Sequence, residues 1–223
     1  MKRNFTRRTI SMAMAAMLAI APVQAMAAAT DMTGHWAEKT VTAWQEQGLI
    51  KGYADGTFKP NNSITRAEFV TIMNNALGFE TAGDISFTDV KEDNWFYNAV
   101  ATAAGAGYCS GYKDGSFKPN ATITRAEAAV MIANALGLEA NEAAVEGFTD
   151  MDAIPGWAMG SIGAVVEAGF MSGYPDASFG AKKSITRAEA VSSLNRAMAD
   201  EEETETPAEG EDTTETPEAP AEG

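Results

Sequence analysis

Residues 52–68 read GYADGTFKPNNSITRAE, and the same pattern returns as GYKDGSFKPNATITRAE at 111–127 and as GYPDASFGAKKSITRAE at 173–189. A tryptophan stands 17 positions before the tyrosine of each copy, and an arginine stands 13 positions after it. Insertions occur only between the copies. Constant spacing within a unit and variable spacing between units are typical of a tandem structural repeat.

The end of each copy predicts the start of a helix. Thr65 and Glu68 match a Thr-x-x-Glu capping box, in which both side chains bond amides at the start of a helix, and apolar residues follow at helical spacing. Gly78 and Gly137 predict where the first two of these helices end. An earlier helix is predicted in each repeat, with an apolar stripe that begins at the tryptophan and ends at a glycine.

A turn-rich loop joins the two predicted helices of each repeat. Asp-Gly in the first two copies is a tight-turn signal. Asp55 and Asp114 are the single aspartates of their loops, too few for an EF-hand-type calcium site, so we expect neither a metal nor a cofactor. A unit of about fifty residues buries too little surface to fold well alone. We therefore expect one all-α domain over about residues 30–199, in which three helix-loop-helix repeats pack with pseudo-threefold symmetry around a shared core.

The two ends of the chain differ from the repeats. Residues 1–27 combine a basic start, an apolar run and a small-residue cleavage site, as an export signal does. The apolar run is shorter than the roughly 20 residues that span a bilayer, so no membrane insertion is expected after the signal is removed. Residues 200–223 hold 11 acidic residues and no basic one, and predict a disordered tail that is either a spacer or an overhang. The predicted repeats occupy 28–83, 84–146 and 147–199.

The charge of the chain limits its partners. Of 16 basic and 31 acidic residues, four basic ones lie in the predicted signal and 11 acidic ones in the tail, so 12 and 20 remain and leave a charge of −8. Nucleic acid is not expected as a partner, because neutralising phosphates requires a basic face. An anionic ligand would have to be held by local cations, since charges are screened beyond about 8 Å in physiological salt.

The only cysteine and the only histidine do not predict catalysis. Cys109 excludes an intramolecular disulfide, and its register opposite Ile50 and Met171 predicts a small buried hydrophobe. His35 lies in a different repeat from Cys109 and is expected to pack or hydrogen-bond beside Trp36. Because no acid, base or nucleophile is marked by the sequence, we do not expect an enzyme.

The motif Gly-Tyr-x-Asp-Gly-x-Phe-x-Pro followed by Ile-Thr-Arg-Ala-Glu, after an aspartate and a tryptophan, resembles the S-layer homology domain family. The resemblance covers nearly all of the chain between the two ends. It implies a threefold helical domain that attaches exported proteins to the bacterial cell wall without covalent linkage. The implied ligand is a secondary wall polysaccharide carrying ketal-linked pyruvate, or peptidoglycan, and the arginine of the motif is the implied contact. A self-assembling surface-layer component is the alternative.

The motif arginines are the main candidates for binding an anionic sugar. Arg66, Arg125 and Arg187 each fall at the first helical position, where the helix dipole disfavours a cation by about 0.3 to 1 kcal/mol. A ligand carboxylate docked there would meet both free amides and a guanidinium. The alternative is an internal ion pair. Its candidate acids are the aspartates that open the repeats, Asp31, Asp89 and Asp150, or a neighbouring glutamate.

The glycine and the aromatic residues of each repeat are further candidates. The glycine that opens each copy serves either a special backbone torsion or the close approach of a sugar. The tryptophans and tyrosines are favoured as core residues, with stacking on a sugar at a groove rim as the alternative. These candidates are Gly52, Gly111 and Gly173, and Trp36, Trp95 and Trp157.

The three repeats are not identical. In the third copy Ala177 replaces the glycine of Asp-Gly, and Phe-Gly-Ala replaces Phe-Lys-Pro, so its loop geometry is in doubt. The first repeat opens with Ala29 where the others have phenylalanine. We therefore expect two good grooves, centred on Arg66 and Arg125, and a weaker third groove at Arg187.

Overall fold

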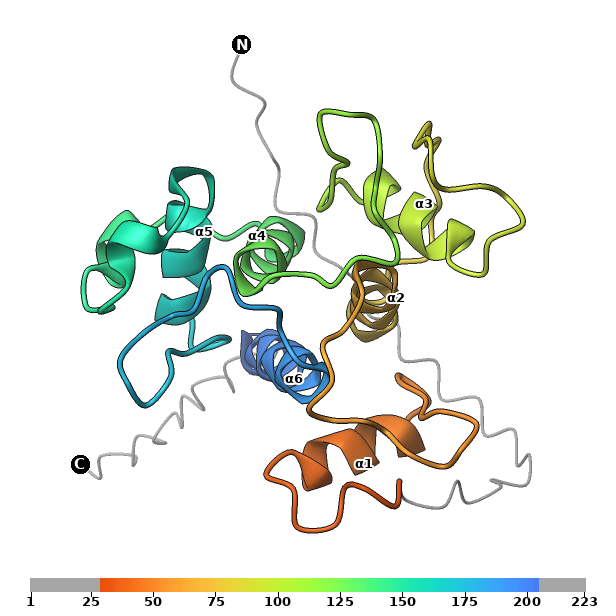
Figure 1. Cartoon of the computed structure of the whole chain (residues 1–223), viewed down its shortest axis with the longest axis horizontal. Coiled ribbons are helices and arrows are strands. Elements are labelled where there is room, and N and C mark those ends of the chain that lie inside the picture. The colour runs from red at the N-terminus through yellow and green to blue at the C-terminus, as the bar shows by residue number, and fades with distance from the viewer. Residues whose placement is uncertain (1–28, 205–223) are drawn as a thin grey trace, which may run out of the picture.

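A computed structural model describes residues 29–204, and the predicted signal and most of the acidic tail lie outside this range. The regular secondary structure of the described residues is helical, which confirms the all-α prediction (Figure 1). None of their helices is long and apolar enough to cross a membrane. The helices are α1 (Glu38–Glu46), α2 (Arg66–Leu77), α3 (Tyr97–Gly105), α4 (Arg125–Leu136), α5 (Gly156–Glu167) and α6 (Arg187–Thr204), with short 3₁₀ turns η1 (Glu142–Val145) and η2 (Met151–Ala153).

The predicted capping boxes form. Thr65 accepts a hydrogen bond from the Glu68 amide at 3.2 Å, and the Glu68 carboxylate accepts one from the Thr65 amide at 2.9 Å. The same reciprocal pair begins α4 and α6. Gly78 and Gly137 end α2 and α4 in the left-handed conformation, at φ 65° and 63°. These local signals fix the start of all three second helices and the end of two of them.

The second helices α2, α4 and α6 surround the centre of the domain, and α1, α3 and α5 lie outside them (Figure 1). Each outer helix packs on the second helix of the preceding repeat: α3 packs on α2, and α5 packs on α4. The first helix α1 has no preceding repeat and packs on α6 instead. The packed pairs therefore join neighbouring repeats, and the two ends of the domain close a ring.

Three isoleucines form a closed ring of backbone hydrogen bonds at the centre. The amide of Ile64 donates to the carbonyl of Ile185, the amide of Ile185 donates to that of Ile123, and the amide of Ile123 donates to that of Ile64, each at 3.1 Å. All three side chains are fully buried. The ring satisfies backbone groups that burial would otherwise leave without partners, and it marks the pseudo-threefold axis.

One hydrophobic cluster runs through all three repeats, as predicted. Its largest fully buried side chains include Trp44, Phe58, Tyr108, Phe117 and Phe179. Full burial of one such side chain contributes about 1.5 to 3 kcal/mol. Because each repeat contributes its phenylalanine and its helix stripes to the same cluster, the repeats depend on one another for their core.

The favoured placement of the tryptophans in the core is wrong. Trp36, Trp95 and Trp157 are 62%, 66% and 63% exposed. Each stands five positions before a buried residue of the first helix of its repeat, as Trp36 stands before Val41. Trp157 lies within α5, where five steps at 3.6 residues per turn point its side chain well away from Ile162. Trp36 and Trp95 also stand two positions before α1 and α3 begin.

The third loop keeps the geometry of the other two, contrary to expectation. Ala177 has φ 61°, in the same left-handed region as the equivalent Gly56 and Gly115 at 80° and 78°. A second left-handed position follows in every loop, at Lys59 (φ 57°), Lys118 (φ 57°) and Gly180 (φ 70°). The third repeat thus exchanges which of its two left-handed positions is glycine, and the fold of the loop is unchanged.

Candidate functional site

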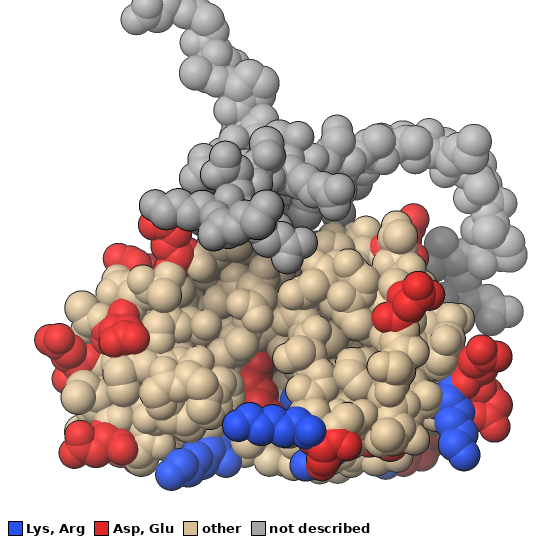
Figure 2. All heavy atoms as spheres, turned by 90° about the horizontal axis from the view of Figure 1, so that it is seen from above, with Lys and Arg blue, Asp and Glu red and all other residues tan. Residues whose placement is uncertain are grey.

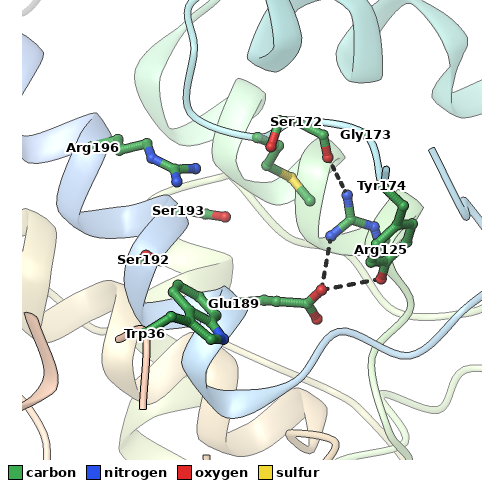
Figure 3. A pocket seen from close by; sticks show the side chains of 10 residues that line it. Trp36, Arg125, Ser172, Gly173, Tyr174, Glu189, Ser192, Ser193 and Arg196 are labelled. Atoms are coloured by element: carbon green, nitrogen blue, oxygen red, sulfur yellow. Dashed lines mark hydrogen bonds and ion pairs between the residues drawn. The ribbon is translucent and has the colours of Figure 1, made fainter. Parts of the chain in front are cut away.

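A groove of about 230 Å³ lies where the third repeat meets the other two (Figure 3). Its lining includes Arg125 from the second repeat, Tyr174, Glu189 and Arg196 from the third, and Trp36 from the first. Arg196 and Trp36 lie on one side of the group of lining residues, with Ser192 and Ser193 between them, and Arg125 and Tyr174 lie on the other side (Figure 3). All three repeats therefore contribute side chains to this one groove.

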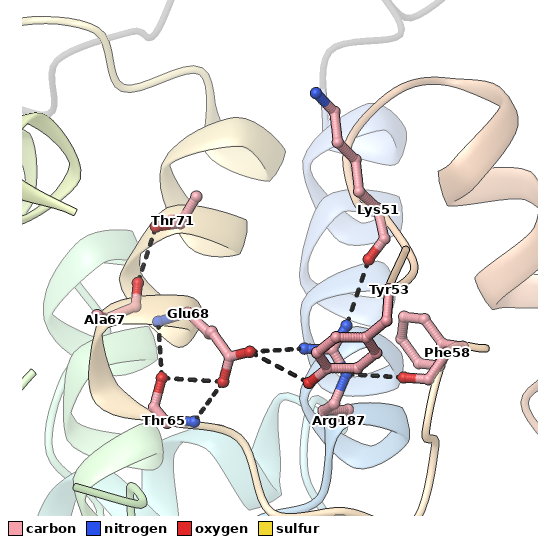
Figure 4. Close-up of polar contacts among 8 residues, drawn as sticks. All are labelled: Lys51, Tyr53, Phe58, Thr65, Ala67, Glu68, Thr71 and Arg187. Atoms are coloured by element: carbon pink, nitrogen blue, oxygen red, sulfur yellow. Dashed lines mark hydrogen bonds and ion pairs between the residues drawn. The ribbon is translucent and has the colours of Figure 1, made fainter. Parts of the chain in front are cut away.

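A second groove, of about 320 Å³, has the same construction one repeat further around the ring. Its lining includes Arg187 from the third repeat, Tyr53, Glu68 and Asn75 from the first, and Trp95 from the second. Figure 4 shows how Arg187 meets Glu68 and Tyr53. The Arg187 groove is thus as well formed as the Arg125 groove, and the geometric reason for expecting a weaker third site is gone.

The motif arginines are buried and joined to the next repeat. Arg66 is 3% exposed; its Nε donates to the carbonyl of Phe117 at 2.9 Å, and its Nη1 lies 3.2 Å from Glu127 Oε1. Its guanidinium carbon lies 4.8 Å from the ring centroids of Tyr112 and Phe117. Arg125 and Arg187 have equivalent partners. The internal pair with a glutamate, one of the two alternatives, therefore forms at all three positions.

The amides at the helix starts are not free for a ligand. The Arg66 amide donates to the carbonyl of Ala121 at 2.9 Å, and the Ala67 amide donates to that of Pro119 at 3.0 Å. Loop carbonyls of the next repeat satisfy the same two amides of α4 and α6. The expectation that a carboxylate docks on these amides is wrong, because the neighbouring repeat occupies them.

The aspartates that open the repeats hold the loops rather than the arginines. Asp31 accepts hydrogen bonds from the amides of Phe58 and Lys59, both at 2.7 Å. Burial raises the pKa of Asp31, but these two amides lower it more, and the pKa ends below its ordinary value. Asp89 and Asp150 bond the two equivalent amides of their own loops at 2.7 to 2.9 Å.

The glycines are required by close packing within the chain. Gly52, Gly111 and Gly173 are not in the left-handed region, so the expectation of a special torsion is wrong. A Cβ atom on Gly111 would lie 2.5 Å from Phe87 Cε1, and one on Gly173 would lie 2.6 Å from Phe148 Cε1. On Gly52, where Ala29 replaces that phenylalanine, a Cβ would still lie 2.8 Å from the carbonyl oxygen of Thr57.

The glutamate of each motif has a second role beyond capping. Glu127 also bonds the hydroxyl of Tyr112 and pairs with Arg66. Burial raises the pKa of Glu127, but hydrogen bonds from Tyr112 and Thr124 and the charge of Arg66 outweigh it, so the pKa lies below its ordinary value. The sequence predicts the cap because its two residues stand three positions apart. The partners of Glu127 Oε1, Tyr112 and Arg66, are brought to it by the tertiary fold.

Cys109 and His35 have structural environments. Cys109 is half-buried against the core, and burial raises the pKa of its thiol to about 12. Ile50 and Met171, in the equivalent positions, are buried. His35 accepts a hydrogen bond from the Ala37 amide at 3.2 Å, and its ring lies 5.4 Å from that of Trp36, as the sequence predicts.

Basic side chains are concentrated on part of this acidic domain. Figure 2 shows the visible Lys and Arg mainly along the lower edge of the view, where some Asp and Glu also lie, with further Asp and Glu on the flanks. The loops of the repeats also carry cations: Lys59 lies 4.2 Å from the ring centroid of Tyr53 and pairs with Asp55 at 3.2 Å. Lys118 has the equivalent contacts in the second repeat. The local cations that an anionic ligand needs are therefore present beside the groove tyrosines.

Residues 30–70, 86–129 and 147–191 each match the S-layer homology domain. The chain belongs to this family. The arginines, glycines and capping boxes described above recur in all three matched segments. Family membership and its surface-protein relatives agree with the predicted location at the bacterial cell surface.

Curated relatives share this part of the chain. The surface-layer 125 kDa protein of Lysinibacillus sphaericus is 36% identical over 157 residues, which cover 70% of this chain and 13% of that protein. The cellulosome-anchoring protein of Acetivibrio thermocellus is 38% identical over 157 residues, covering 67% and 35%. An amylopullulanase of Thermoanaerobacterium thermosulfurigenes is 31% identical over 170 residues, covering 72% and 9%. The chain thus spans about a third or less of the length of these relatives.

Proposed function

We propose that this protein is exported and attaches to the bacterial cell wall without covalent linkage, by binding an anionic, pyruvylated wall polysaccharide in the grooves between its repeats. The observation that carries this proposal is the pair of exposed tryptophans, Trp36 and Trp95, at the two grooves. A pocket with aromatic side chains and a few convergent polar groups is typical of ligand sites. Family membership and the similarity to a surface-layer protein and a cellulosome-anchoring protein support the same conclusion.

The size of the grooves suits short pieces of a polymer. Sites for drug-sized ligands are about 300 to 1,000 Å³, and the two grooves hold about 230 and 320 Å³. Each would accept a sugar or two from a longer chain. A polymer that occupies several grooves gains avidity without a large contact in any one of them.

The motif arginines would act mainly as the wall of each groove. Arg125 and Arg187 line the grooves, yet each is 4% exposed and already paired with a glutamate. A ligand can meet an edge of such a guanidinium, whereas binding it through two hydrogen bonds would displace the internal partners. The tryptophan at the rim is the residue best exposed for contact with a sugar face.

Co-sedimentation with purified walls tests the proposal. The mature protein should sediment with intact walls and stay in solution with walls from which the pyruvylated polymer has been extracted. Equal sedimentation with both preparations would contradict the proposed ligand. The variant Trp36→Ala with Trp95→Ala should lose wall binding and keep the thermal stability of the parent. Lys39→Ala, an exposed change in α1, is the control that should keep both.

A second candidate is a structural component of the envelope that binds peptidoglycan or assembles with itself. The similarity to a surface-layer protein favours it. Retained binding to polymer-free sacculi, or concentration-dependent sheets in solution without any wall, would select this candidate. We propose no catalytic activity, since the shared region is 9% of the amylopullulanase and the motif glutamates are engaged in caps and ion pairs.

A further inference from the structure

We propose that the Arg125 and Arg187 grooves are chemically unequal and that the Arg125 groove selects the anionic group of the ligand through Arg196. This inference deepens the proposed function and depends on it. Arg196 lines the groove from α6 and is exposed, and in Figure 3 its guanidinium is directed from the helix toward the other lining side chains. Its Nη1 donates to the carbonyl of Phe170 at 3.3 Å, which orients the guanidinium.

The register of the repeats shows how unusual Arg196 is. It stands nine positions after the motif arginine Arg187, where the first repeat has Asn75 and the second has Asn134. Asn75 and Asn134 make the equivalent hydrogen bond, to the carbonyls of Leu49 and Tyr108, at 3.0 and 3.3 Å. The bond to the loop carbonyl is therefore shared by all three repeats, and the positive charge is particular to the third.

Two residues between the motif glutamate and the position of Arg196 are also more polar in the third repeat. The third repeat has Ser192 and Ser193, the first has Thr71 and Ile72, and the second has Val130 and Met131. The helix face toward the Arg125 groove is therefore the most polar of the three. Hydroxyl groups beside a guanidinium can donate further hydrogen bonds to a carboxylate.

The Arg125 and Arg187 grooves also differ in charge. In both grooves the motif arginine is paired with a glutamate, so these two charges cancel. Arg196 then gives the Arg125 groove an added positive charge. In the Arg187 groove the lining residue Lys51 contributes its carbonyl to Arg187, while its ammonium points away from the Glu68–Arg187 pair (Figure 4).

A lysine beside the groove adds to this difference. Lys183 lies 4.4 Å from the ring centroid of Tyr174, as Lys59 and Lys118 lie over their tyrosines. Lys59 and Lys118 pair with aspartates at 3.2 and 3.7 Å, whereas no carboxylate among the side chains described for residues 29–199 lies within 4 Å of the Lys183 ammonium. Asp176 lies near enough that the charge of Lys183 helps to lower its pKa. The Arg125 groove thus has Arg196 in its lining, and Lys183 lies over its lining residue Tyr174.

The test uses two sugars of the same shape. One is a hexose methyl glycoside with a 4,6-linked pyruvate ketal, and the other is its methyl ester, which lacks the charge. Titration calorimetry should show that the parent protein prefers the free acid. Arg196→Asn should weaken binding of the acid by about ten- to hundred-fold, the effect of one charge-assisted hydrogen bond, and leave binding of the ester unchanged.

The reciprocal variant provides the matched control. Asn75→Arg places the same charge in the Arg187 groove and should create a second acid-preferring site. Both substitutions exchange residues that already bond a loop carbonyl at this position, so the helical circular dichroism should stay that of the parent. Unchanged acid binding by Arg196→Asn, or no preference for the acid in the parent, would overturn the inference. Wall co-sedimentation of the parent in parallel separates this outcome from failure of the proposed function.

Discussion

The indole nitrogen of Trp44 in α1 donates a hydrogen bond of 2.8 Å to the side-chain oxygen of Asn195 in α6, 151 positions later in the chain. Trp44 is 2% exposed and belongs to the common core. The bond joins the first helix of the domain to the last one. It is the polar counterpart of the packing of α1 on α6, which closes the ring of repeats.

Replacing Trp44 by phenylalanine should therefore loosen the closure of the ring. The phenylalanine side chain keeps most of the apolar volume of the indole. It cannot donate the hydrogen bond, so Asn195 is left without this partner. We expect a loss of about 1 to 2 kcal/mol in the free energy of unfolding, measured by urea denaturation. Asn195→Ala should cost a similar amount, and the double variant should cost less than the sum of the two. Strict additivity would show that the two side chains do not interact in solution.

The closure of the ring also shows what the sequence could predict and what it could not. The capping boxes and left-handed glycines were predictable, because each depends on residues within one or two turns. The partner of Arg66 was not, because Phe117 and Glu127 lie 51 and 61 positions away and belong to another repeat. The exposure of Trp157 was predictable in principle, since its five-residue spacing to Ile162 does not fit one helix face.

Arg66→Ala should destabilise the domain. A substitution of a residue that only contacts the ligand would leave the stability unchanged. The variant leaves Glu127 and the carbonyl of Phe117 without their partner. We expect a loss of about 3 kcal/mol, the lower end of the range for breaking a buried ion pair, because the Glu127 side chain is 18% exposed. Urea denaturation followed by circular dichroism measures it. Parent-like stability together with lost wall binding would instead assign Arg66 to the ligand.

Gly111→Ala should destabilise the second repeat through overpacking. Its Cβ would meet Phe87 at 2.5 Å and the carbonyl oxygen of Ser116 at 2.7 Å. Overpacking of this kind costs about 1 to 3 kcal/mol. Gly147→Ala is the control, because nothing lies within 4 Å of its Cβ position and its φ is not left-handed. That variant should match the parent in a thermal melt or slightly exceed it.

Ala177→Gly should stabilise the third loop. Ala177 has φ 61°, a conformation in which a Cβ is strained and glycine is not. We expect a gain of about 0.5 to 1 kcal/mol. The reverse change at the equivalent position, Gly56→Ala, has open space around its Cβ and should lose a similar amount through φ alone. Opposite signs for these two variants in urea denaturation would support the assigned loop geometry, and equal signs would contradict it.

Acid should destabilise the domain through Glu127 and Asp31. Both have a pKa below their ordinary values of 4.5 and 3.8, so their carboxylates bind fewer protons in the folded state than in the unfolded state. Their contribution is complete above the ordinary values and is lost as the pH falls through the folded pKa of each group. The free energy of unfolding should therefore fall as the pH is lowered below about 4.5.

Glu127→Gln should be less stable than the parent at pH 7 and approach it at pH 3. Glu92→Gln, at an exposed position, should follow the parent at every pH. A Glu127→Gln curve parallel to that of the parent would show that the Arg66–Glu127 contact does not form in solution.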